Sequence, residues 1–341
     1  MKRNLLVALI CGTAPITPLF SGLKSGESSI GAYTWFRYTG ALEKGEIKES
    51  MFGLERGYLR WNHCFTDKID SRVNVDIFST DKFPDGAGLK LKYGYVNFKG
   101  IVKGAKLTVG LQKPYFGIIY DWKYITIQKS LEDKEKVIAS ADYGISLNGD
   151  IPKGYGEYAI EVINGEGYKK YKSKVNKNPA LLANLRVIPI PGITLGGSVL
   201  YERSGILDTV KTEYDQRLLY AGMGRIAFGP LDIWAEYLIA DHITKSAGFM
   251  VMPILNLRKL AGLDIDLIAR LDRWDKDTEK SDDAHMRATG GFNWHLLHRE
   301  KGKMGVVLQV NWERTMYEDP EKDPKDVLMA QLRWEFVTKP F

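Results

Sequence analysis

Two histidines, His295 and His298, form the residue pair with the clearest capacity to bind a metal. Imidazole nitrogens are common ligands of transition metals, and metal sites combine several such side chains. Residues three apart on a β-strand point to opposite faces, however, and no cysteine or carboxylate completes a ligand set here. The sequence therefore predicts neither a metal site nor a cofactor.

Acidic residues gather between Asp272 and Asp283, where they could attract a divalent cation. A solvated outer loop explains the same composition without any ligand, and we favour that interpretation. Another histidine, His242, falls in a second predicted outer loop, but it has no partnered nucleophile of the kind that hydrolases use. We therefore predict no catalytic residue and do not expect an enzyme.

Basic residues on one face of successive segments indicate more about function than these histidines and acidic residues do. Along four segments, basic side chains alternate with apolar ones and so project to a common polar face. These residues are Arg56, Arg60, Arg72, Lys90, Lys92 and Lys106. Acidic residues of the same face come mainly from later segments and include Glu236, Asp264, Asp266, Asp272 and Glu335. If this face lines a lumen, opposite walls of opposite sign produce a transverse field, although charges that merely hydrate the lumen explain the pattern equally well.

Alternation with a period of two runs through the whole chain. In the last segment the apolar residues are Leu328, Ala330, Leu332, Trp334 and Phe336, and the polar ones are Gln331, Arg333 and Glu335. A β-strand with one apolar and one polar face has this pattern. We predict sixteen such segments, with approximate spans 31–39, 51–65, 70–79, 88–99, 105–112, 140–148, 154–163, 179–188, 192–202, 214–228, 231–239, 247–257, 263–272, 285–297, 303–313 and 327–336.

The gaps between these segments distinguish a barrel from a soluble sandwich. Gaps after even-numbered segments are short and rich in Gly, Pro and Asp, as in tight hairpin turns. Gaps after odd-numbered segments are longer and charged, and the longest spans 113–139. We therefore predict an all-β fold, a transmembrane up-and-down antiparallel β-barrel of about 16 strands with short periplasmic turns and long outer loops.

Aromatic residues on the apolar face are expected to form two belts at the lipid–water boundaries. Those near the predicted periplasmic ends of the segments are Trp61, Tyr158, Phe228, Trp294, Trp334 and Phe336. Those near the outer ends are Tyr143, Tyr201, Tyr237 and Trp312. Aromatic residues of a soluble core would not concentrate at strand ends.

The N-terminus predicts export. A basic start precedes a short apolar stretch, Leu5–Cys11, and a small, polar region near Gly22, as in a secretory signal peptide. We assign 1–22 to the signal peptide and 23–341 to the barrel. Export combined with alternating strands predicts the outer membrane of a Gram-negative-type bacterium.

Charge and cysteine content narrow the possible partners and cross-links. The chain has 48 Lys+Arg and 42 Asp+Glu, a formal net charge of +6. Because this mild excess contains no basic run, we expect no nucleic-acid partner. Only Cys64 remains after removal of the signal peptide, so we expect no intramolecular disulfide.

Two consecutive segments resemble a known family. The stretch Lys90–Lys99, a short turn and then Leu107–Gly117 are similar to the phosphate-selective porin O and P family, where such a strand runs into a Lys-x-Pro-Phe-Gly-like start of the third outer loop. The matching positions are Lys113, Pro114, Phe116 and Gly117, and Lys129-Ser130-Leu131 is similar to the later part of that loop. The resemblance implies a sixteen-stranded porin, a third loop folded into the barrel and a homotrimer. It does not indicate phosphate as the solute.

The gap 113–139 is expected to do more than connect two strands. Connections this long are uncommon in compact domains unless they have a function. Its aromatic residues would be costly to leave in water, so we expect this segment to fold into the lumen and constrict it, with a short helix around Gln128–Val137. Lys123 and Lys129 would then face the basic wall or the passage itself.

These observations favour a diffusion porin, a water-filled channel for small hydrophilic solutes and ions with a mild preference for anions. The expected partners are these solutes, outer-membrane lipid and the barrel assembly machinery, for which Phe336 or Phe341 resembles the terminal aromatic signal. Two alternatives remain open. One is an outer-membrane β-barrel enzyme, and the other is a secreted soluble β-protein that binds carbohydrate.

Overall fold

The computed structural model describes residues 22–170, 178–203, 216–298 and 304–341. The predicted signal peptide, 1–22, therefore lies outside the described residues apart from Gly22. None of the helices in the described ranges is long and apolar enough to cross a membrane.

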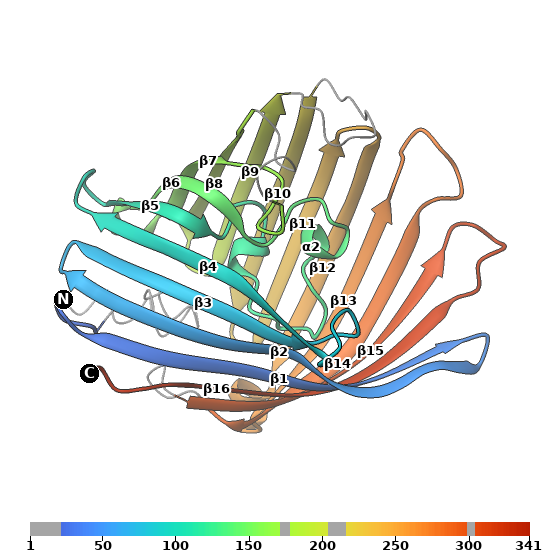
Figure 1. The fold of residues 1–341 in the computed structure, drawn as a ribbon. Coiled ribbons are helices and arrows are strands. Elements are labelled where there is room, and N and C mark those ends of the chain that lie inside the picture. Colours follow the sequence, from blue (N-terminus) through green and yellow to red (C-terminus); the bar gives the residue numbers. More distant parts are fainter. Residues whose placement is uncertain (1–21, 171–177, 204–215, 299–303) are drawn as a thin grey trace.

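Sixteen antiparallel strands form one closed barrel, in which each strand pairs with its neighbours in sequence and β1 pairs with β16 (Figure 1). The strands are β1 (Ser28–Glu43), β2 (Glu46–Thr66), β3 (Ile69–Ser79), β4 (Ala87–Lys99), β5 (Ala105–Gln112), β6 (Asp142–Ile151), β7 (Gly156–Ile163), β8 (Ala180–Ile190), β9 (Ile193–Arg203), β10 (Gln216–Phe228), β11 (Leu231–Asp241), β12 (Lys245–Asn256), β13 (Ile265–Asp275), β14 (His285–Leu297), β15 (Met304–Tyr317) and β16 (Lys325–Val337). The prediction of a sixteen-stranded up-and-down barrel is confirmed.

The described connections between strands contain the short helices η1 (Ile119–Asp121), α2 (Leu131–Lys134), η2 (Pro152–Gly154) and α3 (Leu257–Ala261). Both described ends of the chain lie at one end of the barrel, which we call the terminal end, and the opposite end is the loop end (Figure 1). The longest connection, between β5 and β6, contains η1 and α2 and reaches into the barrel interior (Figure 1).

The connection between β1 and β2 is shorter than predicted. The two strands continue past the apolar alternation and meet at a two-residue turn of Lys44 and Gly45. Both turn residues have positive φ, 55° and 78°, which is the geometry that tight hairpins favour. β11 and β12 are likewise joined by a short turn, from His242 to Thr244. Backbone pairing extends these hairpins beyond the point where side-chain alternation stops. The observed connections are therefore shorter than the gaps in the alternation predict.

The strands form because their two faces meet different surroundings. In β3, Val73 and Ile77 are 43% and 38% exposed on the outer face, whereas Asn74 and Asp76 between them are 0% and 1% exposed on the inner face. Large apolar side chains are similarly exposed on the outer face of the other strands around the barrel. An apolar belt of this extent is unfavourable in water and is the surface that a barrel presents to lipid.

The aromatic residues assigned to the two belts lie on this outer face near the strand ends. Exposed members near the terminal end are Trp61, Phe228, Trp294 and Phe336. Exposed members near the loop end are Tyr201, Tyr237 and Trp312. The belts therefore follow the strand ends, as an interfacial position requires.

The C-terminal residues continue the pairing with β1 beyond the end of β16. The backbone N–H of Ser28 donates to the carbonyl of Phe341 at 2.9 Å, and the N–H of Phe341 donates to the carbonyl of Ser28 at 3.1 Å. Phe341 and Phe336 are both exposed, so either ring is accessible. Which of them serves as an assembly signal stays a prediction.

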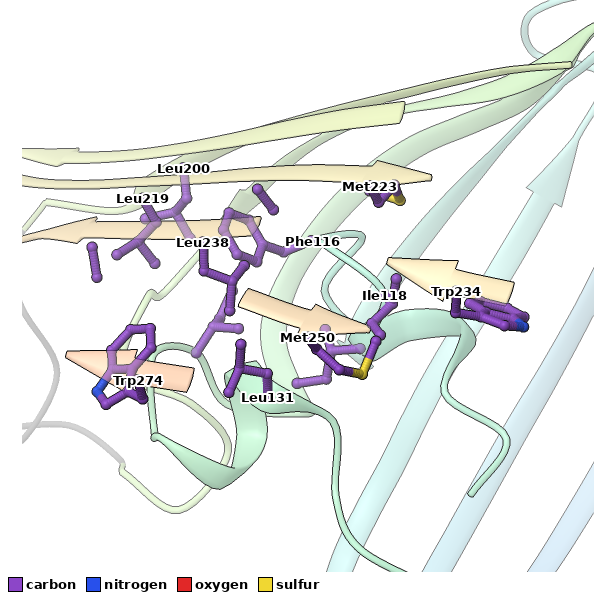
Figure 2. Close-up of a cluster of buried hydrophobic side chains, with 14 of the residues drawn as sticks. Phe116, Ile118, Leu131, Leu200, Leu219, Met223, Trp234, Leu238, Met250 and Trp274 are labelled. Carbon is purple, nitrogen blue, oxygen red and sulfur yellow. The ribbon is translucent and has the colours of Figure 1, made fainter. Parts of the chain in front are cut away.

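The inner face of the later strands carries a group of apolar side chains among its polar ones, which we did not predict from the sequence. Buried inward side chains of β8 to β13 include Leu182, Leu200, Leu219, Leu238, Met250, Ile268 and Trp274. The segment between β5 and β6 covers them with Phe116, Ile118 and Leu131 (Figure 2). The barrel thus contains a hydrophobic core on one side of its interior.

Candidate functional site

The segment 113–141 begins by following the inner wall from β7 to β11. The N–H of Tyr115 donates to Glu161 Oε2 at 3.0 Å on β7, and the N–H of Gly117 donates to Ser198 Oγ at 3.0 Å on β9. The N–H of Ile118 then reaches Glu236 Oε1 at 2.9 Å on β11. Each of these buried backbone donors therefore finds a side-chain acceptor on the barrel wall.

The same segment continues across β13 and β15 before it returns to β4. Arg270 of β13 donates to the carbonyl of Lys129 at 2.8 Å, and the N–H of Ile127 donates to Asn311 Oδ1 at 2.7 Å. Lys134 forms an ion pair of 2.6 Å with Glu313 of β15. Lys92 of β4 donates to Ser140 Oγ at 2.6 Å, close to the start of β6.

Burial of apolar side chains fixes this segment to the wall. Phe116 and Leu131 are both 0% exposed and pack in the cluster that includes Leu238 and Met250 (Figure 2). Fully burying a side chain of this size stabilises by about 1.5–3 kcal/mol. The predicted helix around 128–137 is only α2, because the backbone leaves the helical conformation after one turn.

Tyr124 brings the segment against the opposite, early wall. Its ring centroid lies 4.4 Å from that of Trp35 on β1, and its carbonyl accepts from Gln309 Nε2 at 3.0 Å. The residue has a φ of 53°, a conformation that costs of the order of 1 kcal/mol or more in a residue with a side chain. These contacts on its two sides hold it there, so Tyr124 joins the segment to β1 and β15.

The six basic residues named from the sequence all lie on the inner face of β2 to β5, and we call them the basic strip: Arg56, Arg60, Arg72, Lys90, Lys92 and Lys106. Arg56 donates to the hydroxyls of Tyr58 and Tyr124, and its guanidinium lies 4.9 Å from the ring centroid of Trp35. Arg60 lies 4.6 Å from the ring of Tyr33.

The remaining members of the basic strip have polar and aromatic neighbours. Arg72 Nε donates to Asn62 Oδ1 at 2.8 Å. Lys90 forms an ion pair of 3.2 Å with Asp76, and Lys92 lies 4.5 Å from the ring of Tyr168. The cations were predicted from the sequence, but the aromatic rings beside them were not. Tyrosines spaced two apart, as at Tyr93 and Tyr95, were the available signal.

Lys123 and Lys129 are exposed on the segment, and their orientation toward the basic strip or the passage stays a prediction. The carbonyl of Lys123 accepts from Arg333 Nη1 at 2.9 Å, and Lys129 pairs with Asp133 at 3.3 Å. Neither ammonium group has a described contact with the basic strip. Lys113, at the start of the segment, lies between the rings of Tyr115 and Tyr120, and burial lowers its pKa to about 8.

The two walls are not simply of opposite sign. Later strands also carry inward arginines, and these are paired: Arg186 with Asp121, Arg270 with Asp272, and Arg287 with Glu135 and Asp272. Asp70 and Asp76 lie among the basic residues of the early wall. Instead of a simple transverse field, the later wall carries these ion pairs, and the early wall carries Arg56, Arg60 and Lys92, which have no carboxylate within 4.0 Å among the described residues.

Asp264 does not lie on the inner face of a strand as predicted, because it precedes β13 at the terminal end. Its carboxylate forms ion pairs with His298 at 2.8 Å and with Arg258 at 3.2 Å, and the neighbouring His298 lowers the pKa of Asp264. His295 pairs with Asp266 at 2.8 Å.

The two histidine rings are stacked, with centroids 4.9 Å apart and an interplanar angle of 10°. The two imidazoles therefore do not point to opposite faces, and the prediction for this pair is wrong. The register of β14 shifts between His295 and Leu297, and this bulge turns both imidazoles to the same side. Within the described ranges, the structure shows no group of three or more side chains placed to hold a metal ion.

The fold of this chain is similar to that of known proteins, although its sequence is not. The sequence matches no protein-family model and no curated protein. Among solved structures, the outer membrane channel DcaP of Acinetobacter baumannii has a TM-score of 0.63 at 12% identity, over 92% of this chain and 99% of that one. The chain has the fold of outer-membrane barrels.

Two further solved structures have a similar fold. OprB of Pseudomonas putida has a TM-score of 0.62 at 10% identity, over 92% of this chain and 94% of that one. The trimer form of OmpT, an outer membrane protein of Vibrio cholerae, has a TM-score of 0.59 at 10% identity, over 91% and 99% of the two chains. At such identities the likeness extends to the fold and to nothing finer.

Proposed function

We propose that this protein is a diffusion porin of the outer membrane, with a water-filled passage for small hydrophilic solutes and ions. The observation that carries the proposal is the asymmetric interior. The segment 113–139 packs on the apolar cluster of β8 to β13 and on the paired charges around it, whereas the basic strip on β2 to β5 keeps charged and polar groups facing the interior. Charged and polar walls favour water, and so the passage follows the basic strip, with 113–139 as its constriction.

A mild preference for anions follows from the charges of this strip. Asp76 neutralises Lys90, but Arg56, Arg60 and Lys92 have no carboxylate within 4.0 Å among the described residues. Fixed cations beside a narrow passage raise the local concentration of anions through the focused field. The preference should weaken with added salt, because the Debye length falls to ~3 Å at 1 M.

The deciding measurement is the zero-current potential across a planar bilayer that separates two KCl concentrations. A potential of the anion-selective sign at low salt is expected, and it should shrink as both concentrations rise. A cation-selective sign would refute the anion preference and leave the channel intact. Absence of any conductance from correctly folded barrels would refute the porin itself.

Insertion into the membrane and assembly are parts of the same proposal. The exposed apolar outer face supports contact with outer-membrane lipid and argues against a secreted soluble β-protein that binds carbohydrate. The trimeric OmpT structure of the same fold supports a homotrimer here, which cross-linking before denaturing electrophoresis would detect. No arrangement within the described residues favours the alternative of a barrel enzyme.

A further inference from the structure

Part of the basic strip holds cations that have no carboxylate partner in the part of the chain that the structure describes. The neighbouring carboxylates are engaged elsewhere, Asp76 with Lys90 and Asp70 with Lys99. Arg60 is only 9% exposed, yet no carboxylate of the described chain lies within 4.0 Å of its guanidinium. Because a buried cation is costly unless an anion compensates it, the surroundings of Arg60 favour a bound anion.

Asn74, beside Arg60, supplies an independent observation. It is 0% exposed on the inner face of β3, and neither its amide nitrogen nor its amide oxygen has a hydrogen-bond partner within the described residues. Strand register places Asn74 directly between Arg60 of β2 and Tyr93 of β4. Arg60 Nε is also buried without a partner there. Buried polar atoms are normally satisfied, so these groups have hydrogen-bonding capacity that a ligand can take up.

Aromatic rings surround the same position. The ring of Tyr33 lies 4.6 Å from the Arg60 guanidinium, and the rings of Tyr93 and Tyr95 meet edge to face with centroids 6.4 Å apart. Ring faces and edges contribute dispersion and quadrupole contacts to a planar unsaturated ligand, and they offer little to a hydrated inorganic ion.

We propose that Arg60, Asn74, Tyr93 and Tyr95 form a binding site for organic anions that combine a carboxylate with an aromatic ring. This inference rests on the proposed porin function, because it names the class of solute that passes along the basic strip. The planar fork of Arg60 pairs with the planar carboxylate, and the Asn74 amide donates to one of its oxygens. The ligand ring packs against the two tyrosines of β4.

Three anions distinguish this proposal from general attraction of negative charge. Benzoate has both the carboxylate and the aromatic ring. Cyclohexanecarboxylate has the carboxylate but a saturated ring, and inorganic phosphate has neither a carboxylate nor a ring. Each is added to single channels at low salt, and the concentration that halves the ion current is measured. Benzoate should act at the lowest concentration of the three. Equal concentrations for benzoate and cyclohexanecarboxylate, or a lower one for phosphate, would overturn the proposed ligand class.

Variants then locate the site. Arg60→Gln, Asn74→Leu and Arg60→Lys should each raise the half-blocking benzoate concentration about tenfold or more, since each removes a charge-assisted or carboxylate-matched hydrogen bond. Arg225→Gln is the matched control, because Arg225 of β10 is already paired with Asp232 at 2.6 Å. Its half-blocking concentration should not change. An unchanged value in all three site variants would place binding elsewhere.

Two further measurements separate failure of the site from failure of the channel. The shift in gel mobility on heating reports folding of each variant, and Asn74→Leu keeps the test available if Arg60 variants do not fold. Calorimetric titration of benzoate into the detergent-solubilised barrel needs no conductance. Benzoate binding without conductance would refute the porin and support the site, whereas conductance without binding would refute the site alone.

Discussion

Glu132 of α2 and Glu236 of β11 place their Oε1 atoms 2.8 Å and 2.9 Å from the same amide nitrogen, that of Ile118. Both carboxyl groups are buried, and Glu132 also accepts from the N–H of Ile119 at 3.1 Å. The start and the helical part of the inserted segment are thereby tied to each other and to the barrel wall. Gly117, with a φ of 51°, makes this approach possible.

Replacement of Gly117 by alanine should loosen the segment without preventing barrel formation. An added Cβ would lie 2.3 Å from Glu132 Oε1 and 2.4 Å from Glu236 Oε1. The left-handed backbone adds about 1–2 kcal/mol of strain. We expect larger fluctuations of the single-channel current and faster proteolysis within 113–139. Gly222→Ala is the control, because a Cβ there meets nothing within 4 Å, and it should behave like the native chain.

Leu332→Arg should impair barrel assembly, because Leu332 is 37% exposed on the lipid-facing side of β16. A basic residue near the middle of the bilayer costs about 2–4 kcal/mol. The neighbouring Gln331→Glu is the control, since Gln331 faces inward and its Oε1 already accepts from Arg37 at 2.8 Å and 2.9 Å. The fraction of heat-modifiable barrel is the measurement, and equal fractions for the two variants would mean a register error of one residue.

Much of the barrel could be predicted because most strands separate lipid from a polar interior. β3 alternates Val73, Asn74, Val75, Asp76 and Ile77, and this pattern fixes both strand and orientation. Hairpin length was harder to predict. The backbone pairing that continues β1 and β2 to Lys44 and Gly45 has no counterpart in side-chain alternation.

The inward side chains of β2 to β5 were predicted from the sequence, whereas the apolar cluster on the inner side of β8 to β13 was not. Basic residues between apolar neighbours showed the inner face of β2 to β5. On β12, Met250, Val251 and Met252 are apolar on both faces, which was the available signal for a wall covered from inside. Pairings such as Arg270 with Asp272 depend on side chains of one strand turning toward the inserted segment, and spacing alone does not determine that.

Deletion of residues 118–134 should raise the single-channel conductance. These residues supply Ile118 and Leu131 to the apolar cluster and cross the interior from β11 to β15, so their loss widens the passage. Deletion of 319–322, in the turn between β15 and β16 at the loop end, is the control and should leave the conductance unchanged. An unchanged conductance in the 118–134 deletion would show that the segment does not limit the flow of ions.

The anion preference should fall as pH rises through about 8, in part because of Lys113. Burial lowers the pKa of Lys113 from its usual 10.5 to about 8, between the rings of Tyr115 and Tyr120. The side chain is therefore charged below this pH and neutral above it. The unfolded chain keeps the proton up to about pH 10.5, so this group makes folding more favourable as pH rises from about 8 to 10.5.

Zero-current potentials at about pH 6.5 and about pH 9.5 measure the contribution of this charge. The native channel should lose anion selectivity between the two values, and Lys113→Gln should lose less, because it lacks the proton that Lys113 releases. Lys259→Gln is the control: Lys259 is an exposed residue of α3 whose ammonium donates to the carbonyl of Gly229 at 3.1 Å, and its variant should keep the native pH dependence. If native and Lys113→Gln channels lose selectivity equally, Lys113 does not face the permeating ions, and the charge that titrates belongs to another part of the passage.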